Sequence, residues 1–392
     1  MSKSVCLIAG GLHDNTMRLQ PWRYLAEVAR QLKRQGHEVS VISDGVEGDD
    51  LATHRIPSVS NPCWQENRPL RHAVEAIQPD VLLWHIGLSS LLHQRLDVGI
   101  PIPTVGIFTS PIYQFRDLAR LGVGRIVRER GLTAVHTAAT LTPNFLLRRG
   151  LSQNSHLQRL VVQTETTRTQ LQQAKLNRLP ISVIMPGVDK VWRNDVRTSS
   201  SELRQRLGYT ESDVVVLYFG SPARLRGLHT LIEAIQKSSA SNPALKLLIL
   251  SRRHAGELMA EDAALRDLLN KDGMAARTQI ISGFLKPENL VAHLAAADVV
   301  ALPFELVPSD APLSLLEAQA LGKPIVTTTI ACLPELVANG PHYLAKPADA
   351  NSLASAITAA ANDLCRNTPM TTLKPRCWQE MGESWSCLIQ NL

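Results

Sequence analysis

A short segment late in the chain combines a proline, capping side chains and a carboxylate at a spacing suited to phosphate and ribose binding. Ser309 and Asp310 precede Pro312, and the apolar residues that follow predict a helix over 313–321. Proline suits the first helical turn because its φ is fixed and it lacks an N–H, and Ser or Asp is a frequent cap. The free N–H groups and the positive dipole end of such a helix favour a bound phosphate. Glu317, one turn inside, could accept hydrogen bonds from a ribose hydroxyl pair; alternatively it merely lies on the helix while Ser309 and Asp310 cap it.

A second segment that could do chemistry follows the apolar run 214–219. It reads Gly220-Ser221-Pro222-Ala223-Arg224-Leu225-Arg226-Gly227. The forked donors of arginine suit a diphosphate, and a glycine lets the backbone approach it closely. Arginine is common in surface loops, so this loop alone is a weak signal. Gly10-Gly11 is also weak, because it lacks the spacing of a dinucleotide fingerprint and so does not support a bound NAD.

The elements that must position these residues alternate between strand-like and helix-like segments. In the first half we expect strands at 5–9, 37–43, 81–85, 103–108 and 181–185, and a helix at 22–32. In the second half we expect strands at 214–220, 246–250, 279–282, 298–303 and 324–328, with helices at 228–235, 287–296 and 313–321. This alternation predicts parallel sheets covered by helices on both faces. The stretch 192–210, rich in Arg and Ser, is interpreted as the linker and lead-in to the second domain.

Length and composition fit a globular protein of two domains. The chain has 392 residues, of which 44% are hydrophobic and 19% charged, and domains usually hold about 100–200 residues. No apolar run reaches the roughly 20 residues of a membrane-spanning helix, and the N-terminus lacks the features of a secretion signal, so we expect a cytoplasmic protein. The six cysteines are scattered without the paired spacing of zinc or redox motifs. We therefore expect free thiols and no structural metal.

The net charge of +6 lies entirely in the N-terminal half, where residues 1–195 hold 23 Lys and Arg against 16 Asp and Glu. Arginines 116, 120, 125, 128 and 130 alternate with apolar residues at a spacing that could form a basic amphipathic helix on an anionic membrane surface. The alternative is an ordinary solvated helix face. Nucleic acid is a weaker partner, because only 4% of the residues are aromatic and no recognition motif accompanies the charge.

Taken in chain order, these segments resemble the family-4 retaining glycosyltransferases of GT-B fold. The loop from Gly220 to Gly227 resembles the diphosphate loop of that family, with Arg226 in place of the usual lysine. Further similar segments, in chain order, are Gly10-Gly11 with the helix after it, Gly36-His37-Glu38-Val39, Pro79-Asp80-Val81-Leu82-Leu83-Trp84-His85, Pro186-Gly187-Val188-Asp189, Glu317-Ala318-Gln319-Ala320, Gly322-Lys323-Pro324-Ile325-Val326, Leu333-Pro334-Glu335-Leu336-Val337 and Glu383-Ser384-Trp385. The last of these resembles the start of a terminal helix that crosses back onto the first domain.

The resemblance implies an α/β protein of GT-B type, with two Rossmann-like domains facing a central cleft and a C-terminal helix crossing back to the first domain. Residues 1–190, completed by about 376–392, would form the acceptor domain, and 191–375 the nucleotide-sugar donor domain. The implied reaction moves a hexosyl group from a nucleotide diphosphate sugar to a hydroxyl of a glycan or lipid-linked acceptor. It would retain the anomeric configuration, need no metal and no cofactor, and serve envelope or exopolysaccharide synthesis, with peripheral association at the inner face of the membrane.

The resemblance also implies residue roles. Arg226, helped by Arg224, would stabilise charge on the leaving diphosphate, and Ser309 and Asp310 are the further catalytic candidates. The donor would be bound by Gly220, Ser221, Arg224, Arg226, Leu313, Ser314 and Glu317. The acceptor would lie near Gly11, His13 and Thr109.

Several positions depart from the family pattern. Phe108-Thr109-Ser110-Pro111 stands where many members place a histidine, and three further departures concern the donor side. Ser309 stands where a glutamate is usual, Pro312 replaces a glycine before the donor helix, and Ser221 replaces an arginine. They motivate an alternative, a degenerate GT-B protein that binds a nucleotide or a partner transferase without catalysis. A third possibility is an epimerase or phosphorylase of similar fold, although no lysine in a recognisable setting for pyridoxal phosphate is found.

Overall fold

The computed structural model divides into two compact units. Unit 1 comprises Met1–Gly187, Pro308–Pro312 and Arg376–Leu392, and unit 2 comprises Val188–Val307 and Leu313–Pro375. The structure describes residues 2–12, 16–17, 19–45, 51, 53–60, 67–87, 98–113, 119–122, 156–173, 179–193, 197–220, 224–251, 263–271, 273–283, 285–307, 309–366 and 374–392.

Unit 1 is built on a parallel sheet whose described strands run in the order β3-β2-β1-β4-β5-β6-β7. Their bounds are β1 Ser4–Ile8, β2 Glu38–Ser43, β3 Thr53–Arg55, β4 Val81–Ile86, β5 Thr104–Phe108, β6 Leu157–Val162 and β7 Ile181–Val183. The central strands are buried almost throughout, because their apolar runs do not alternate with polar residues. The order reverses between β1 and β4, which makes the loops after these strands a topological switch point.

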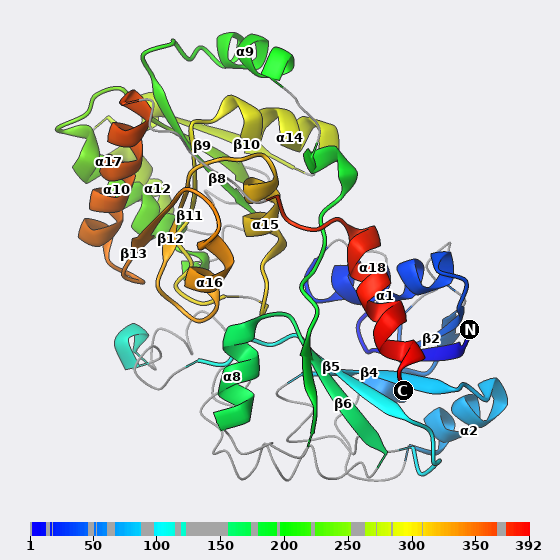
Figure 1. Cartoon of the computed structure of the whole chain (residues 1–392). Helices are drawn as coiled ribbons and strands as arrows, with labels where there is room; N and C mark the ends of the chain where they lie inside the picture. The colour runs from blue at the N-terminus through cyan, green and yellow to red at the C-terminus, as the bar shows by residue number, and fades with distance from the viewer. Residues whose placement is uncertain are drawn as a thin grey trace. The chain divides into compact units, whose positions relative to one another are not determined.

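The C-terminal segment folds onto unit 1. The described helices of this unit are α1 Trp22–Arg34, α2 Arg68–Ile77, α8 Glu165–Gln173 and α18 Trp378–Gln390, with a 3-10 helix at Pro57–Ser60. α18 lies beside α1 (Figure 1), and a Cβ on Gly382 would lie 2.5 Å from the Cβ of Gln31, so only glycine allows this approach. The Trp385 indole N–H donates to the Tyr24 hydroxyl at 3.1 Å, which donates to the Ile184 carbonyl at 2.8 Å.

Unit 2 contains a second parallel sheet, with its described strands in the order β10-β9-β8-β11-β12-β13. Their bounds are β8 Val214–Gly220, β9 Leu245–Ser251, β10 Thr278–Ser282, β11 Val299–Leu302, β12 Ile325–Thr328 and β13 His342–Ala345. Numbered within the unit, this is the same order as the first six strands of unit 1. Its switch point lies between β8 and β11.

Helices cover the sheet of unit 2. The described ones are α9 Arg197–Arg206, α10 Leu228–Ser239, α12 Ala263–Asn270, α13 Met274–Arg277, α14 Pro287–Ala296, α15 Leu313–Ala320, α16 Leu333–Val337 and α17 Ala350–Cys365, with 3-10 helices at Lys190–Arg193 and Arg224–Arg226. α10 and α17 pack side by side (Figure 1) over a core that includes Tyr218, Leu231 and Ile357. The Lys323 ammonium donates to the carbonyls of Ala295 and Ala297 at the end of α14.

The predicted fold class, two parallel Rossmann-like sheets with a C-terminal helix on the first, is confirmed, while several elements differ from the prediction. The strands β3, β6 and β13 were not predicted, and α18 begins at Trp378, five residues before Glu383. The interpretation of 192–210 as a linker is wrong for 197–206, which form α9. Burial of Leu203 and the bonds of Arg204 to the Ala296 carbonyl (3.0 Å) and Asp298 (2.8 Å) hold this helix on the unit.

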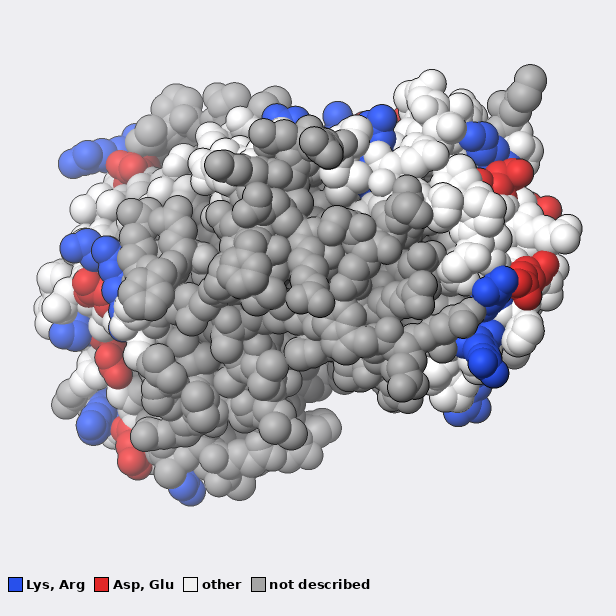
Figure 2. All heavy atoms as spheres, turned by 90° about the horizontal axis from the view of Figure 1, so that it is seen from below, with Lys and Arg blue, Asp and Glu red and all other residues white. Residues whose placement is uncertain are grey.

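Basic and acidic side chains both occur on the described surface. On the face drawn in Figure 2, described Lys and Arg side chains lie among Asp and Glu side chains at both edges. Of the five arginines between 116 and 130, only Arg120 belongs to the described residues, so the expected basic amphipathic helix lies outside them. Among the described residues, the helices are too short or too polar to span a bilayer.

Candidate functional site

Two loops follow neighbouring strands at the switch point of unit 2. β8 ends at Gly220 and β11, which pairs with it, ends at Leu302 (Figure 1). Ligands of open parallel sheets bind beyond the carboxyl ends of the strands at such a reversal of strand order. The predicted donor residue Arg226 follows β8, and the segment after β11 leads into α15, which carries the predicted donor residues Leu313, Ser314 and Glu317.

Arg226 is held against the end of β8. Its guanidinium carbon lies 5.7 Å from the centroid of the Phe304 ring, and its Nη1 lies 2.8 Å from the position that a Cβ would take on Gly220. Gly220 has φ +130°, a conformation that residues with a side chain rarely adopt. The cation–π contact and the missing side chain at Gly220 therefore fix this half-buried guanidinium beside the strand end. Its forked donors suit a diphosphate.

The loops after β8 and β11 pack so closely that no side chain fits between them. Gly227 has φ +81°, and a Cβ there would lie 1.9 Å from the carbonyl oxygen of Pro303. The backbone N–H groups of Glu305 and Leu306 both donate to the Leu225 carbonyl at 2.9 Å. The loop that carries Arg226 is therefore tied to the loop after β11 by backbone contacts.

A buried carboxylate supports the same loop. Glu305 is fully buried, and its Oε1 accepts a 2.6 Å hydrogen bond from the Thr230 hydroxyl on α10. Glu305, Thr230 and Phe304 were not among the predicted site residues. The signal that could have found Glu305 and Phe304 is their position directly after the apolar run of β11, at the carboxyl end of a central strand.

The exposed face of α15 carries the other predicted donor residues. Leu313, Ser314 and Glu317 are partly exposed, whereas residues 315, 316 and 318–320 are buried. Positions i, i+1 and i+4 share one side of a helix near its start. The free N–H groups and the positive dipole end lie at the start of α15, one turn before the partly exposed Glu317. This arrangement can bind a phosphate and a hydroxyl pair together.

Ser309 and Asp310 are buried within unit 1 and do not belong to the exposed face of α15. One carboxylate oxygen of Asp310 accepts from the hydroxyls of Thr164 (2.7 Å) and Thr167 (2.6 Å), and the other accepts from the Gln163 N–H (2.9 Å). The two oxygens thus bind the residues at the start of α8, while the Ser309 hydroxyl is buried with no partner in the described structure. The expectation that these side chains cap the helix after Pro312 is not what the structure shows. Their catalytic role stays a prediction.

Thr109 and His85 extend this buried polar group. The Thr109 carbonyl accepts from the Asp310 N–H at 2.8 Å, and its Oγ1 lies 2.9 Å from His85 Nε2. Burial lowers the pKa of His85 to about 4, so its imidazole is neutral at pH 7. Thr109 itself is 2% exposed. Its predicted place beside an acceptor stays a prediction.

Gly11 lies just after β1, at the switch point of unit 1. Its φ is +79°, and a Cβ there would lie 2.5 Å from Trp22 Nε1, which donates to the Gly10 carbonyl at 3.1 Å. The Gly11 N–H donates to an Asp44 carboxylate oxygen at 2.6 Å. The fold therefore needs glycine at this position.

Some predicted site residues lie outside the described structure. Ser221 and His13 are among them, and so is the side chain of Arg224. Within the described residues, no three His, Cys, Asp or Glu side chains are grouped so that they could hold a metal ion.

Comparison with known proteins adds two family models. "Glycosyltransferase Family 4" matches residues 22–191, and "Glycosyl transferases group 1" matches residues 213–363. Among curated relatives, a D-inositol 3-phosphate glycosyltransferase of Corynebacterium urealyticum is 32% identical over 41% of this chain and 38% of its own length. A glycogen synthase of Mycobacterium tuberculosis is 32% identical over 47% of this chain and 40% of its own length. The chain thus spans about two-fifths of the length of these relatives.

A solved structure matches along the whole chain. Anabaena Alr3699/HepE in complex with UDP has a TM-score of 0.71 at 16% identity, over 99% of this chain and 100% of its own. The same protein has been solved with UDP-glucose. At this identity the likeness shows the fold. Together with the two family models and the strand order of both units, it places this chain among the family-4 and group-1 glycosyltransferases of GT-B fold.

Proposed function

We propose that the chain is a retaining glycosyltransferase that moves a hexosyl group from a nucleotide diphosphate sugar to a hydroxyl of a glycan or lipid-linked acceptor. The observation that carries the proposal is the switch point of unit 2. There the loop with Arg226 follows β8, and the exposed start of α15 with Glu317 follows the loop after β11. The complexes of HepE with UDP and UDP-glucose support a nucleotide sugar as donor and make UDP the first nucleotide to test.

Each group at this edge has a role in that reaction. Backbone N–H groups at Leu313 and Ser314 and the helix dipole bind the donor phosphates. Arg226 stabilises the negative charge that develops on the diphosphate as the sugar departs, which is the kind of assistance that usually contributes most to such a step. The Glu317 carboxylate accepts hydrogen bonds from the ribose. Because these groups supply the positive charge that the leaving group needs, the proposed reaction uses no metal and no cofactor.

The acceptor is proposed to be a polyhydroxylated molecule bound by unit 1 near Gly11. The names of the relatives, a D-inositol 3-phosphate glycosyltransferase and a glycogen synthase, support a hydroxyl-rich acceptor. Synthesis of an envelope glycan or an exopolysaccharide is the cellular setting that we propose for this reaction.

Calorimetric titration of the full chain with UDP, GDP, ADP and TDP tests the donor site. We expect one nucleotide to bind, and Arg226→Ala and Glu317→Ala each to weaken it by about tenfold or more, as the loss of a charge-assisted hydrogen bond implies. Arg206→Ala is the matched control in unit 2, because that side chain is exposed on α9. Unchanged affinity in both site variants would remove the assignment.

The chemistry is tested separately with the nucleotide sugar that binds. Proton NMR of the early product should show the same anomeric configuration as the donor, and EDTA should leave the rate unchanged. An inverted product would exclude the retaining mechanism, and a rate restored only by added Mg²⁺ or Mn²⁺ would exclude metal independence.

The alternative is a degenerate protein that binds a nucleotide or a partner transferase without transfer. One observation favours it: both carboxylate oxygens of Asp310, the acidic residue next to Ser309, are bound by residues at the start of α8. Slow hydrolysis of the donor in the absence of an acceptor would exclude this alternative. Tight nucleotide binding with no turnover of any nucleotide sugar would support it.

A further inference from the structure

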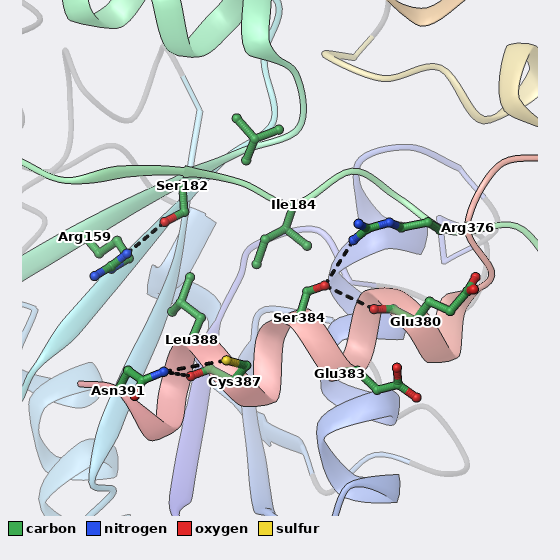
Figure 3. A pocket seen from close by; sticks show the side chains of 11 residues that line it. Arg159, Ser182, Ile184, Arg376, Glu380, Glu383, Ser384, Cys387, Leu388 and Asn391 are labelled. Atoms are coloured by element: carbon green, nitrogen blue, oxygen red, sulfur yellow. Dashed lines mark hydrogen bonds between the residues drawn. The ribbon is translucent and has the colours of Figure 1, made fainter. Parts of the chain in front are cut away.

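Unit 1 contains a pocket formed by the edge of its sheet and the terminal helix. Residues of β6, the edge strand β7 and α18, together with Ile184 and Arg376, line an open surface pocket of about 780 Å³ (Figure 3). Ligand pockets typically measure about 300–1,000 Å³, so this one has the size of a small-molecule site. No residue proposed for the donor or acceptor lines it.

Two arginines face this pocket without an ionic partner. Arg159 on β6 donates from Nη1 to the Ser182 hydroxyl at 2.9 Å, and Arg376 donates to the Ser384 hydroxyl at 3.2 Å. Neither guanidinium has an ion pair in the described structure, and the buried Nε of Arg159 has no acceptor there. Apart from the bond to Ser182, the structure thus gives the Arg159 side chain no partner among the described residues. The guanidinium N–H groups of Arg159 that do not bond to Ser182 suit a carboxylate or a phosphate.

The acidic side chains of the pocket lie away from Arg159. Figure 3 shows Glu380 and Glu383 at the end of the pocket near Arg376, whereas Arg159 and Asn391 lie at the opposite end. Glu380 accepts the Cys377 N–H at 2.6 Å as part of the cap of α18. The end with Arg159 therefore favours an anionic group, and the other end presents both a cation and a carboxylate.

Further groups of the pocket suit vicinal hydroxyls on an apolar ring face. Ser182 accepts from Arg159 and still has a proton to donate, and the Asn391 amide donates to Cys387 while its oxygen stays available. Ile184 and Leu388 supply an apolar surface between the two ends (Figure 3). Hydroxyl-rich rings need donors and acceptors in this mixture, together with an apolar surface for their C–H groups.

We propose that this pocket binds a saccharide that carries one anionic group, either a carboxylate or a phosphate. The anionic group lies against the Arg159 guanidinium, and the ring hydroxyls bond to Ser182, Asn391 and the groups around Arg376. The site is separate from the polar group around Asp310, because Arg159 precedes Gln163 by four residues, roughly 13 Å along the strand. It goes beyond the proposed transfer reaction and requires no donor turnover.

The exposed thiol of Cys387 provides a direct readout, because it lines the pocket. Alkylation of Cys387 by iodoacetamide is followed in the full chain by peptide mass spectrometry, so that other thiols do not interfere. We expect glucuronate or glucose 6-phosphate at about 10 mM to slow it by about threefold or more, as millimolar binding implies. Glucose alone and inorganic phosphate alone should each slow the alkylation less than glucuronate or glucose 6-phosphate does.

Variants connect the protection to the two arginines. Arg159→Gln and Arg376→Gln should each abolish protection, while Arg34→Gln, an exposed arginine at the end of α1, should preserve it. Arg226→Ala should also preserve protection, so failure of the donor site and failure of this pocket are distinguishable. Equal protection by glucose or by phosphate alone, no protection by either acidic sugar, or full protection in Arg159→Gln would each overturn the proposal.

Discussion

At the scale of single residues, Gly227 must be glycine for two reasons, its positive φ and its close contact with Pro303. Its φ of +81° and the 1.9 Å between a hypothetical Cβ and the Pro303 carbonyl oxygen leave no room for a side chain. We expect Gly227→Ala to displace the loop of Arg226, to lower the free energy of unfolding of unit 2 by more than about 2 kcal/mol and to abolish nucleotide binding. Calorimetric unfolding and nucleotide titration measure both effects.

Gly208 supplies the matched control for this substitution. Its φ is +73°, but nothing lies within 4 Å of a Cβ there. Gly208→Ala should therefore cost only the conformational strain, about 1 kcal/mol, and leave nucleotide binding intact. If both variants lost the same free energy of unfolding, the contact with Pro303 would not contribute to stability.

His85 predicts a pH dependence of stability. Its folded pKa of about 4 lies below its usual value of 6.5 because burial disfavours the charged imidazole. Between these values the unfolded chain binds a proton that the folded chain does not, so acidification lowers the free energy of unfolding by up to about 3 kcal/mol. Comparing calorimetric unfolding of wild type and His85→Gln from pH 7 to pH 4 isolates this loss. The stability gap between the two proteins should narrow as the pH falls; a constant gap would contradict the prediction.

The partly exposed residues of the proposed donor site were predicted from the sequence, whereas the buried residues that support them were not. Arg226 and Glu317 carry functional groups whose type and spacing indicate phosphate and ribose binding, and the fold brings both to one end of the sheet of unit 2. Glu305 and Thr230 lie 75 residues apart, and their hydrogen bond depends on how the loop after β11 packs on α10. No local pattern predicts such a pair, because tertiary packing alone creates it.

At the scale of elements, Asp310 anchors the start of α8 to the segment 309–312. We expect Asp310→Asn to lower the free energy of unfolding of unit 1 by about 1–3 kcal/mol, because an amide N–H₂ would then meet another donor in place of a carboxylate oxygen. Hydrogen exchange of the first amides of α8 should also accelerate. Mass-resolved exchange with calorimetry measures both effects.

Asp80→Asn is the matched control, since that exposed carboxylate accepts a single backbone N–H from Ser4 at 2.7 Å. It should cost less than about 1 kcal/mol and leave the exchange of α8 unchanged. If Asp310→Asn reduced turnover while exchange at α8 stayed as in wild type, Asp310 would act on the substrate and not on α8.

Elements with continuous apolar runs were predictable, and those held by distant contacts were not. β8 and β4 were expected within one residue of their observed ends, because uninterrupted apolar residues mark strands buried on both faces. β6 contains Gln158 and Arg159 in its first half and so lacks that signal. α9 is rich in Ser and Arg, and its place depends on Arg204, whose carbonyl and carboxylate partners lie up to 94 residues away.

At the scale of the whole molecule, the alternation of strands and helices predicted parallel sheets, whereas the strand order, which the six strands of unit 2 share with the first six of unit 1, comes from the structure. In both units the strand order reverses next to the first strand. Gly11 lies beyond the carboxyl end of β1 in unit 1, and Arg226 lies beyond the carboxyl end of β8 in unit 2, each at such a switch point. The return of α18 to unit 1 depends on its contacts with α1, where Gly382 meets Gln31. The packing of the terminal helix on unit 1 was predicted from the family resemblance and not from the local sequence pattern of α18.

The uneven charge of the whole chain leads to a prediction about membranes. The excess of basic residues lies in residues 1–195, and surface charge attracts such segments to anionic lipid by about 1 kcal/mol per residue. We expect the protein to float with phosphatidylglycerol vesicles at low salt and to detach at about 0.5 M salt, where screening is strong.

Replacing arginines 125, 128 and 130 by Gln should reduce flotation. Replacing lysines 237, 271 and 286 of unit 2, which are exposed, changes the net charge equally and should not. Equal losses in the two variants would show that net charge, and not the arginine-rich segment, drives binding, and no flotation at low salt would exclude this surface as a membrane contact.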